Sequence, residues 1–199
     1  VNKQVQPVIL KKLNNPYFMS DGNKENVSFI FEIAKILKIK KNNLFTALKK
    51  FDGLQYRQQI IFKSKTLTII NDSKATTFSS SVSILNTLSN VFWIVGGLAK
   101  KGDKFLLSKK NFKNSKAYIF GKNKNFFSKK LKKIIKFEIF LNLKSLIKKV
   151  VIDVKNNKNQ NHITILFSPA AASFDSFKNF EERGKYFNNL IKKAFNVRR

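Results

Sequence analysis

Short apolar runs recur along the chain, and most of them end abruptly in polar residues. Valine, isoleucine, leucine and aromatic residues make up these runs, as is typical of buried β-strands. The first two apolar runs, residues 60–62 and 67–70, flank a polar segment at residues 63–65, and this spacing predicts a β-hairpin. Residues 137–140 are a further short apolar segment whose pattern leaves strand and coil open. The predicted strands cover residues 60–62, 67–70, 91–95, 117–120 and 163–167.

Between these runs, apolar residues recur at the three- and four-residue spacing of amphipathic helices. Ile30, Ile33 and Leu37 show this spacing, and Asn26 before them has a side chain suited to a helix N-cap. The predicted helices cover residues 26–37, 43–51, 76–88, 126–135, 143–151 and 176–194.

Strands that alternate with helices predict an α/β fold in which helices cover both faces of a mostly parallel sheet. Residues 91–95 are apolar throughout, which is typical of a parallel strand buried on both faces. Residues 1–21 lack such an alternation and resemble the trailing end of a preceding domain, with one short apolar piece at residues 8–10.

Three polar segments, residues 71–77, 96–100 and 167–175, each follow a predicted strand of the same sheet. They should therefore line the carboxyl edge of the sheet, where α/β proteins bind ligands. Lys74 and Lys100 would bring ammonium groups to this edge, and Thr76 and Ser173 would bring hydroxyls. Such a set suits a small dicarboxylate, because charge-assisted hydrogen bonds to carboxylates are among the stronger polar contacts. An ordinary strand-to-helix connection is the alternative interpretation of residues 71–77.

Composition excludes several classes of site. The chain has no cysteine and one histidine, His162, so neither a disulfide framework nor a zinc site is expected. The nearest match to a P-loop, residues 97–103, carries Asp103 where the phosphate-binding lysine must stand. We find no signal peptide and no apolar run long enough to cross a bilayer. The chain begins at Val1 without a methionine, and we therefore expect a fragment or a processed product.

The formal net charge of +29 is the usual signature of a nucleic-acid-binding protein. Lysine, asparagine, isoleucine and phenylalanine are all abundant here, and a genome poor in G and C would enrich them together. The lysines are also scattered rather than gathered in one stripe. A basic nucleic-acid-binding module of Rossmann-like fold nevertheless stays open as the alternative function.

Three motifs resemble the D-glutamate-adding Mur ligases, the UDP-N-acetylmuramoyl-L-alanine:D-glutamate ligase family. Residues 71–76 read N-D-S-K-A-T and follow G-L-Q-Y-R at residues 53–57. Residues 93–100, W-I-V-G-G-L-A-K, match a second block of the family. The third is S-P-A-A-A-S-F-D-S-F-K-N-F-E-E-R-G at residues 168–184. The resemblance covers about residues 22–190.

The resemblance implies an ATP-dependent amide ligase of peptidoglycan synthesis in the cytoplasm, expected to be monomeric, without membrane insertion or a specific nucleic-acid partner. ATP would phosphorylate the carboxylate of UDP-N-acetylmuramoyl-L-alanine, and the amine of D-glutamate would attack the resulting acyl phosphate. Residues 1–52 would be the helical end of the central ATP-binding domain, and residues 53–199 the Rossmann-like C-terminal domain. The P-loop and the Mg²⁺ ligands of the family would lie upstream, so the isolated chain is expected to be inactive.

The same resemblance assigns individual residues to this reaction. Lys74 would be catalytic, near the transferring phosphate. For the nucleotide, Asn26 would face the adenine, Asp72 the ribose and Arg57 the phosphates. For D-glutamate, Thr76 and Lys100 would hold one carboxylate, and Ser173, with backbone near Phe174 and Phe180, the other. No residue of this chain is expected to bind a metal.

Other interpretations of these residues stay open. Asn26 also fits a helix cap, Phe180 fits the core, and Arg183 fits a structural ion pair. Tyr56 replaces a usual histidine of the family, Ala171 a usual cysteine, and Leu98 an acidic residue of some relatives. A Rossmann-like domain whose sites have decayed is a further alternative, although all three motifs are retained.

Overall fold

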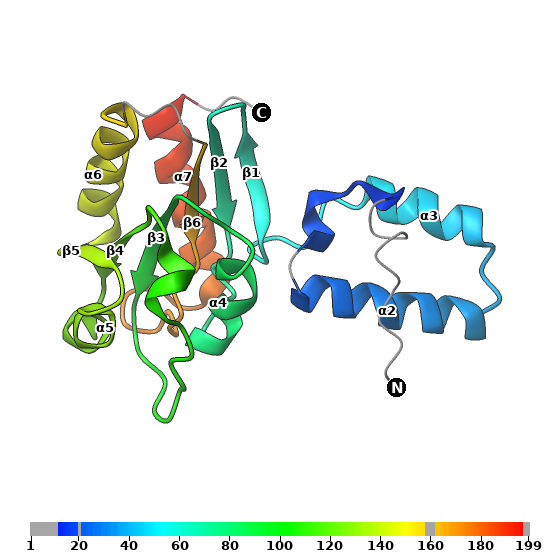
Figure 1. The fold of residues 1–199 in the computed structure, drawn as a ribbon, viewed down its shortest axis with the longest axis horizontal. Helices are drawn as coiled ribbons and strands as arrows, with labels where there is room; N and C mark the ends of the chain where they lie inside the picture. The colour runs from blue at the N-terminus through cyan, green and yellow to red at the C-terminus, as the bar shows by residue number, and fades with distance from the viewer. Residues whose placement is uncertain (1–11, 20, 158–161, 197–199) are drawn as a thin grey trace. The chain divides into compact units, whose positions relative to one another are not determined.

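A computed structural model describes residues 12–19, 21–157 and 162–196 of the chain. The chain divides into two compact units, Val1–Gly53 and Leu54–Arg199, which are described separately (Figure 1). The apolar piece predicted at residues 8–10 lies outside the described residues.

The first unit contains a short 3-10 helix, η1 (Pro16–Met19), and two α-helices, α2 (Asp21–Ile36) and α3 (Lys41–Lys50). Its small core contains Leu13, Phe18, Val27 and Leu48.

One prediction in this unit is wrong. The helix α2 begins at Asp21, five residues before the predicted start, so Asn26 lies inside the helix and is no N-cap. Asn23 is buried in the first turns of α2, and its side-chain amide donates to the carbonyl of Tyr17 at 2.6 Å. This bond connects the start of α2 to η1, and the spacing of apolar residues in the sequence does not predict such a bond.

The second unit is built on one six-stranded sheet with the order β1-β2-β6-β3-β4-β5. The first two strands form the predicted antiparallel hairpin, and the other pairs are parallel. Residues 137–140, which the sequence left open, contribute most of the edge strand β5. The strands are β1 (Gln59–Lys63), β2 (Leu67–Asn71), β3 (Val91–Gly96), β4 (Lys116–Phe120), β5 (Lys136–Ile139) and β6 (Ile163–Phe167).

Helices cover both faces of this sheet, as predicted for a mostly parallel α/β fold. On one face lie α4 (Phe78–Leu85), η2 (Lys109–Phe112) and α5 (Lys124–Leu131). On the other lie α6 (Leu143–Lys155) and α7 (Phe180–Phe195). Two of the predicted helix starts were early. Thr77 and Asn179 cap α4 and α7 with side chains that accept backbone N–H bonds, so the preceding residues belong to turns.

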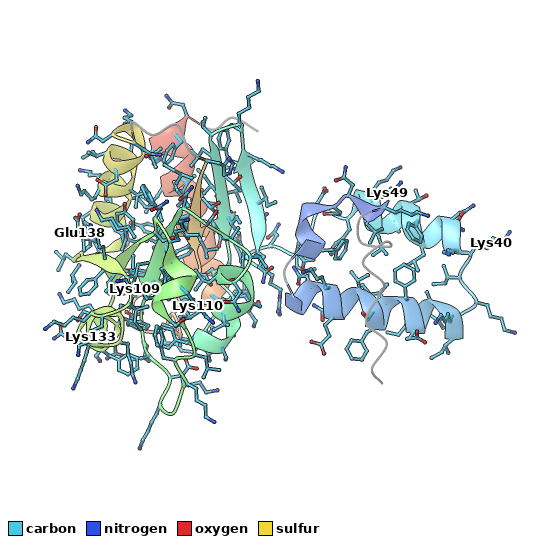
Figure 2. All side chains as sticks on the ribbon, in the orientation of Figure 1. Lys40, Lys49, Lys109, Lys110, Lys133 and Glu138 are labelled. Carbon is cyan, nitrogen blue, oxygen red and sulfur yellow. The ribbon has the colours of Figure 1, made fainter. Side chains whose placement is uncertain are left out.

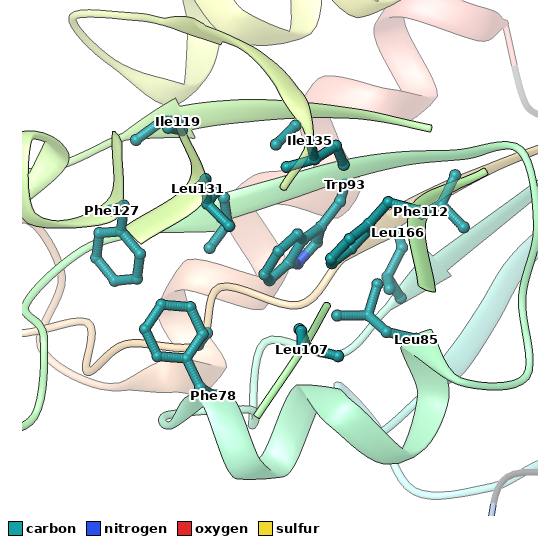
Figure 3. Packing of buried hydrophobic residues seen from close by; sticks show 14 of the residues in the cluster. Phe78, Leu85, Trp93, Leu107, Phe112, Ile119, Phe127, Leu131, Ile135 and Leu166 are labelled. Atoms are coloured by element: carbon teal, nitrogen blue, oxygen red, sulfur yellow. The ribbon is translucent and has the colours of Figure 1, made fainter. Parts of the chain in front are cut away.

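Each central strand contributes alternate side chains to the two cores. Trp93 and Val95 of β3 point to the α4 and α5 side, whereas Ile94 between them points to the α6 and α7 side. Trp93 is fully buried and stacks on Phe112, with ring centroids 5.6 Å apart (Figure 3). This packing fixes the central strands and therefore the positions of the loops that follow them.

The described residues lack two kinds of feature. No helix among them combines the length and apolar character needed to cross a membrane. They also contain no group of three or more histidine, cysteine, aspartate or glutamate residues that could hold a metal ion.

Candidate functional site

Three polar loops meet at the carboxyl edge of the sheet, where β2, β6 and β3 end. These strands are adjacent and parallel, so their carboxyl ends lie on the same side. The backbone N–H of Asp72 donates to the carbonyl of Phe167 at 2.7 Å, and that of Gly96 donates to the carbonyl of Pro169 at 2.9 Å. Leu98 and Ala172 form an isolated β-bridge. The structure thus brings together the three segments that the sequence predicted for this edge.

Gly97 permits the close approach of the β3 and β6 loops. Its φ of +133° lies in a region that side-chain-bearing residues rarely adopt. A Cβ added there would lie 2.7 Å from the carbonyl oxygen of Ala172, closer than non-bonded atoms allow. This position therefore requires glycine for a local steric reason.

Asp72 is buried at this edge, with only 5% of its surface exposed. One carboxylate oxygen accepts from the hydroxyl of Ser168 at 2.8 Å, and the other accepts from the backbone N–H of Gln58 at 3.1 Å. Burial raises the pKa of Asp72 to about 7, although these two bonds and the nearby Arg57 and Arg183 act in the opposite direction. Asp72 thus ties the β2 loop to the β6 loop and to the segment that carries Arg57.

Lys74 is half-buried beside the start of α7. Its backbone N–H donates to the carbonyl of Tyr56 at 3.0 Å. Its ammonium nitrogen lies 4.0 Å from the ring centroid of Phe180, in the arrangement of a cation–π contact. Lys74 and Phe180, predicted for different roles, are therefore direct neighbours.

The other residues predicted for D-glutamate differ in exposure. Thr76 is half-buried and Lys100 is exposed. Ser173 is 2% exposed, while its neighbour Phe174 is 70% exposed. All four lie on the loops that follow β2, β3 and β6.

The remaining nucleotide residues fall in different parts of the chain. Arg57 is exposed on the loop before β1, close to the Gln58 N–H that binds Asp72. Asn26 is exposed on α2 of the first unit, which is described separately.

Arg183, which the sequence predicted to be a structural ion-pair residue, instead makes hydrogen bonds to two loops of this edge. Arg183 is 1% exposed, and its guanidinium donates to Ser73 and to the carbonyl of Ala171. Within the described part of the chain, no carboxylate lies within ion-pair distance of it, so the ion-pair expectation is corrected. Burial lowers the pKa of Arg183 to about 10. The only sequence signal was its place in the third motif.

Asp175, in the loop between β6 and α7, connects the end of a fourth strand, β4, to the site. Its carboxylate accepts from the backbone N–H of Lys122 at 2.9 Å. The β6–α7 loop is thus bonded to the loops after β2, β3 and β4. Lys74 and Lys100 lie on these loops and Arg57 lies on the segment bonded to Asp72, all of them half-buried or exposed, and such cations suit an anionic ligand.

Comparisons with known proteins agree with the three motifs. No family model matches the chain. A UDP-N-acetylmuramoylalanine–D-glutamate ligase from Wolbachia pipientis wMel is 33% identical over 193 residues, which are 94% of this chain and 38% of that protein. Ligases of the same name from Rickettsia felis and Francisella tularensis SCHU S4 are 34% and 33% identical, over 90% and 86% of this chain.

The resemblance predicted from the motifs, to the D-glutamate-adding Mur ligases, is confirmed by these comparisons. The chain spans about two fifths of the length of the curated relatives it matches, 38% to 41% of each.

Proposed function

We propose that this chain, a relative of the D-glutamate-adding Mur ligases, forms the C-terminal part of an ATP-dependent ligase in peptidoglycan synthesis. That ligase would join D-glutamate to UDP-N-acetylmuramoyl-L-alanine, in the cytoplasm and as a monomer. The observation that supports this most strongly is the meeting of the three motif-bearing loops at one edge of the sheet. Residues 1–52 would then be the end of the central ATP-binding domain, and residues 53–199 the C-terminal domain.

ATP would supply the phosphoryl group that activates the substrate carboxylate, and the amine of D-glutamate would displace it as phosphate. In this chain, Lys74 would place its ammonium beside the transferring phosphate, where positive charge stabilises the transition state. Thr76 and Lys100 would bind one carboxylate of D-glutamate. Ser173, with the backbone near Phe174 and Phe180, would bind the other. The placement of these side chains on the three loops that follow β2, β3 and β6 supports this assignment.

For ATP, Arg57 would contact the phosphates, Asn26 the adenine and Asp72 the ribose. An exposed guanidinium at Arg57 fits a phosphate. The Asp72 carboxylate is buried and bonded on both oxygens, so binding a ribose would require it to share or exchange one of these partners. Mg²⁺ would be held by other parts of the ligase, and the described residues of this chain contain no group of three or more histidine, cysteine, aspartate or glutamate residues that could hold a metal ion.

We also propose that the isolated chain has no ligase activity, because its sequence contains no P-loop motif. The test is an assay of the purified chain with ATP, D-glutamate and UDP-N-acetylmuramoyl-L-alanine. Release of phosphate that depends on both acceptor and amino acid would refute this proposal.

Binding of D-glutamate can be tested on the chain itself by NMR titration. D-Glutamate should shift the backbone signals of the loops after β2, β3 and β6. Lys100→Ala and Ser173→Ala should each weaken binding at least tenfold, since each removes a proposed carboxylate contact. Lys101→Ala is the matched control, because Lys101 is the adjacent exposed lysine and has no proposed contact. Equal weakening by Lys101→Ala would mean that the effect is only nonspecific charge.

Catalysis can be tested in a complete ligase that carries this chain as its C-terminal part. Lys74→Ala and Ser173→Ala should each lower kcat/KM for D-glutamate by a factor of about a hundred or more, the size seen when one group that stabilises a transition state is removed. Kinetics close to wild type in both variants would defeat the site assignment.

A further inference from the structure

We propose that Arg183 is a positioning residue, which holds the peptide unit before Lys74 so that the Lys74 ammonium is kept over the ring of Phe180. For its consequence in catalysis, this inference rests on the function proposed above for Lys74. The geometry itself does not depend on that function.

The carbonyl of Ser73 and the N–H of Lys74 belong to one peptide group, and both ends of this group are bonded. Arg183 donates through Nη2 to the carbonyl of Ser73 at 2.6 Å. The N–H of Lys74 donates to the carbonyl of Tyr56 at 3.0 Å. Because a peptide group is planar, fixing both ends fixes the orientation from which the Lys74 side chain departs.

The Ser73 side chain is held by the same helix. Its hydroxyl accepts from Nε of Arg183 at 3.0 Å and donates to the carbonyl of Phe180 at 2.8 Å. Ser73 is completely buried, so these bonds do not compete with water. The first turn of α7 is thus hydrogen-bonded to the loop after β2 through both Arg183 and Phe180.

Phe180 completes the arrangement through its ring, 4.0 Å from the Lys74 ammonium. The two contacts have different functions: the Arg183 bonds fix the backbone, and the Phe180 ring limits where the flexible side chain can go. A lysine side chain otherwise samples many rotamers, and a catalytic cation is most effective when it is already in place.

Burying a guanidinium costs more free energy than filling the same space in a protein core with an apolar side chain. Removing it from water carries a desolvation penalty, and an apolar side chain of similar size would often be as stabilising or more so. Arg183 directs its donors to two loops, at Ser73 and Ala171, and a lysine has no planar fork of donors to do so. An arginine at this position is explained if its role is to hold the loop after β2 in place rather than to increase the stability of the fold.

The test is NMR of the chain after its lysines have been dimethylated with ¹³C, which keeps their positive charge. The Lys74 methyl signal, assigned by its loss in Lys74→Arg, should be shifted upfield by the ring current of Phe180. Phe180→Leu should abolish this shift. Arg183→Lys should reduce it by at least half, as should Ser73→Ala, which deletes only one oxygen and covers the case in which Arg183→Lys fails to fold.

Lys185→Ala is the control, since Lys185 is exposed on α7 two residues after Arg183. It should leave the Lys74 signal in place. A Lys74 shift that survives both Arg183→Lys and Ser73→Ala would overturn the inference, as would the absence of any upfield shift in the wild type.

Kinetics in a complete ligase separate this inference from the proposed function. Arg183→Lys should lower kcat several-fold more than it raises KM for D-glutamate, because substrate contacts are retained while the Lys74 ammonium is misplaced. If the NMR shift responds to the variants and kcat does not, the positioning by Arg183 holds and the proposed role of Lys74 fails.

Discussion

At the scale of single residues, Asp72 should make the stability of the second unit depend on pH. Burial raises its folded-state pKa to about 7, well above the 3.8 of an unperturbed aspartate. At a pH between these two pKa values, Asp72 keeps its proton in the folded chain and releases it in the unfolded chain. The stabilising contribution is therefore complete below about pH 4 and is lost as the pH rises through 7, with a slope of at most about 1.4 kcal/mol per pH unit.

Urea unfolding at pH 5 and at pH 7.5 measures this effect. The free energy of unfolding should be higher at pH 5 by a margin that Asp72→Asn largely removes. Glu181→Gln is the control, because Glu181 is an exposed carboxylate on α7. If Asp72→Asn shows the same pH dependence as the wild type, the raised pKa of Asp72 is wrong.

Sequence alone named residues with conspicuous chemistry as candidates, but it did not predict the hydrogen bonds that hold this edge of the sheet together. Lys74 and Ser173 were predicted because a cation and a hydroxyl follow apolar strands inside a recognisable motif. The bonds from Ser168 to Asp72 and from Arg183 to Ser73 were not, because they join positions about a hundred residues apart. Periodicity carries no information about such long-range pairs. The true start of α2, at Asp21, was also missed, because the apolar periodicity used to place the helix begins only near Ile30.

At the scale of elements, α7 and the loop before β1 fit together through a glycine. A Cβ at Gly184 would overlap the ring of Tyr56. Gly184→Ala should therefore lower the free energy of unfolding by about 1–3 kcal/mol, the usual cost of overpacking, despite the better helix propensity of alanine. It should also displace Lys74, whose N–H is bonded to the carbonyl of Tyr56.

The double variant Gly184→Ala with Tyr56→Ala tests the cause. Removing the ring makes room for the new methyl group, so the two changes together should cost less than the sum of their separate costs. Additive losses in urea unfolding would show that the Tyr56 ring is not what excludes a side chain at position 184.

A second prediction at this scale concerns the ion pairs that join β4, β5 and α6. Lys116 binds Asp153 at 2.6 Å and also pairs with Glu138 of β5. Lys116→Met should lower the free energy of unfolding by about 1–3 kcal/mol, because it leaves partly buried carboxylates without this partner. Lys136→Met is the control, since Lys136 is the exposed register partner of Lys116 on β5. Equal losses in the two variants would mean that the network contributes nothing specific.

The strands of this fold were more predictable than its helix ends. Central strands such as β3 and β6 are apolar along their length because both faces are buried, and this signal is local in the sequence. The start of α7 depends instead on the cap at Asn179, which a helical pattern extending back to Ser176 conceals. The surfaces and angles at which these elements meet depend on tertiary contacts, and only the structure provides them.

At the scale of the whole molecule, each of the two units has its own core, and they should unfold separately. The second unit buries two large clusters on the faces of its sheet, whereas the buried cluster among the described residues of the first unit consists only of Leu13, Phe18, Val27 and Leu48, with half-buried hydrophobic residues packed against it. A small helical unit with so little buried apolar surface is marginally stable. Amides of α2 and α3 should therefore exchange with solvent at a lower free energy of opening than those of β3 and β6. Residues 54–199 expressed alone should keep the β3 and β6 amide signals of the full chain, and their loss would contradict independent folding.

The charge of the chain tests the alternative function. The chain has forty lysine and arginine residues and eleven acidic ones, and Figure 2 labels lysines on both units. Charge scattered in this way should attract any polyanion through counterion release, so the logarithm of the affinity for duplex DNA should fall linearly with the logarithm of salt concentration. Binding at 150 mM salt should be weak and independent of the DNA sequence, and inorganic polyphosphate should compete as well as DNA at low salt. Tight, sequence-dependent binding that persists at 150 mM salt would instead require a built recognition surface, and the nucleic-acid-binding interpretation would then replace the ligase.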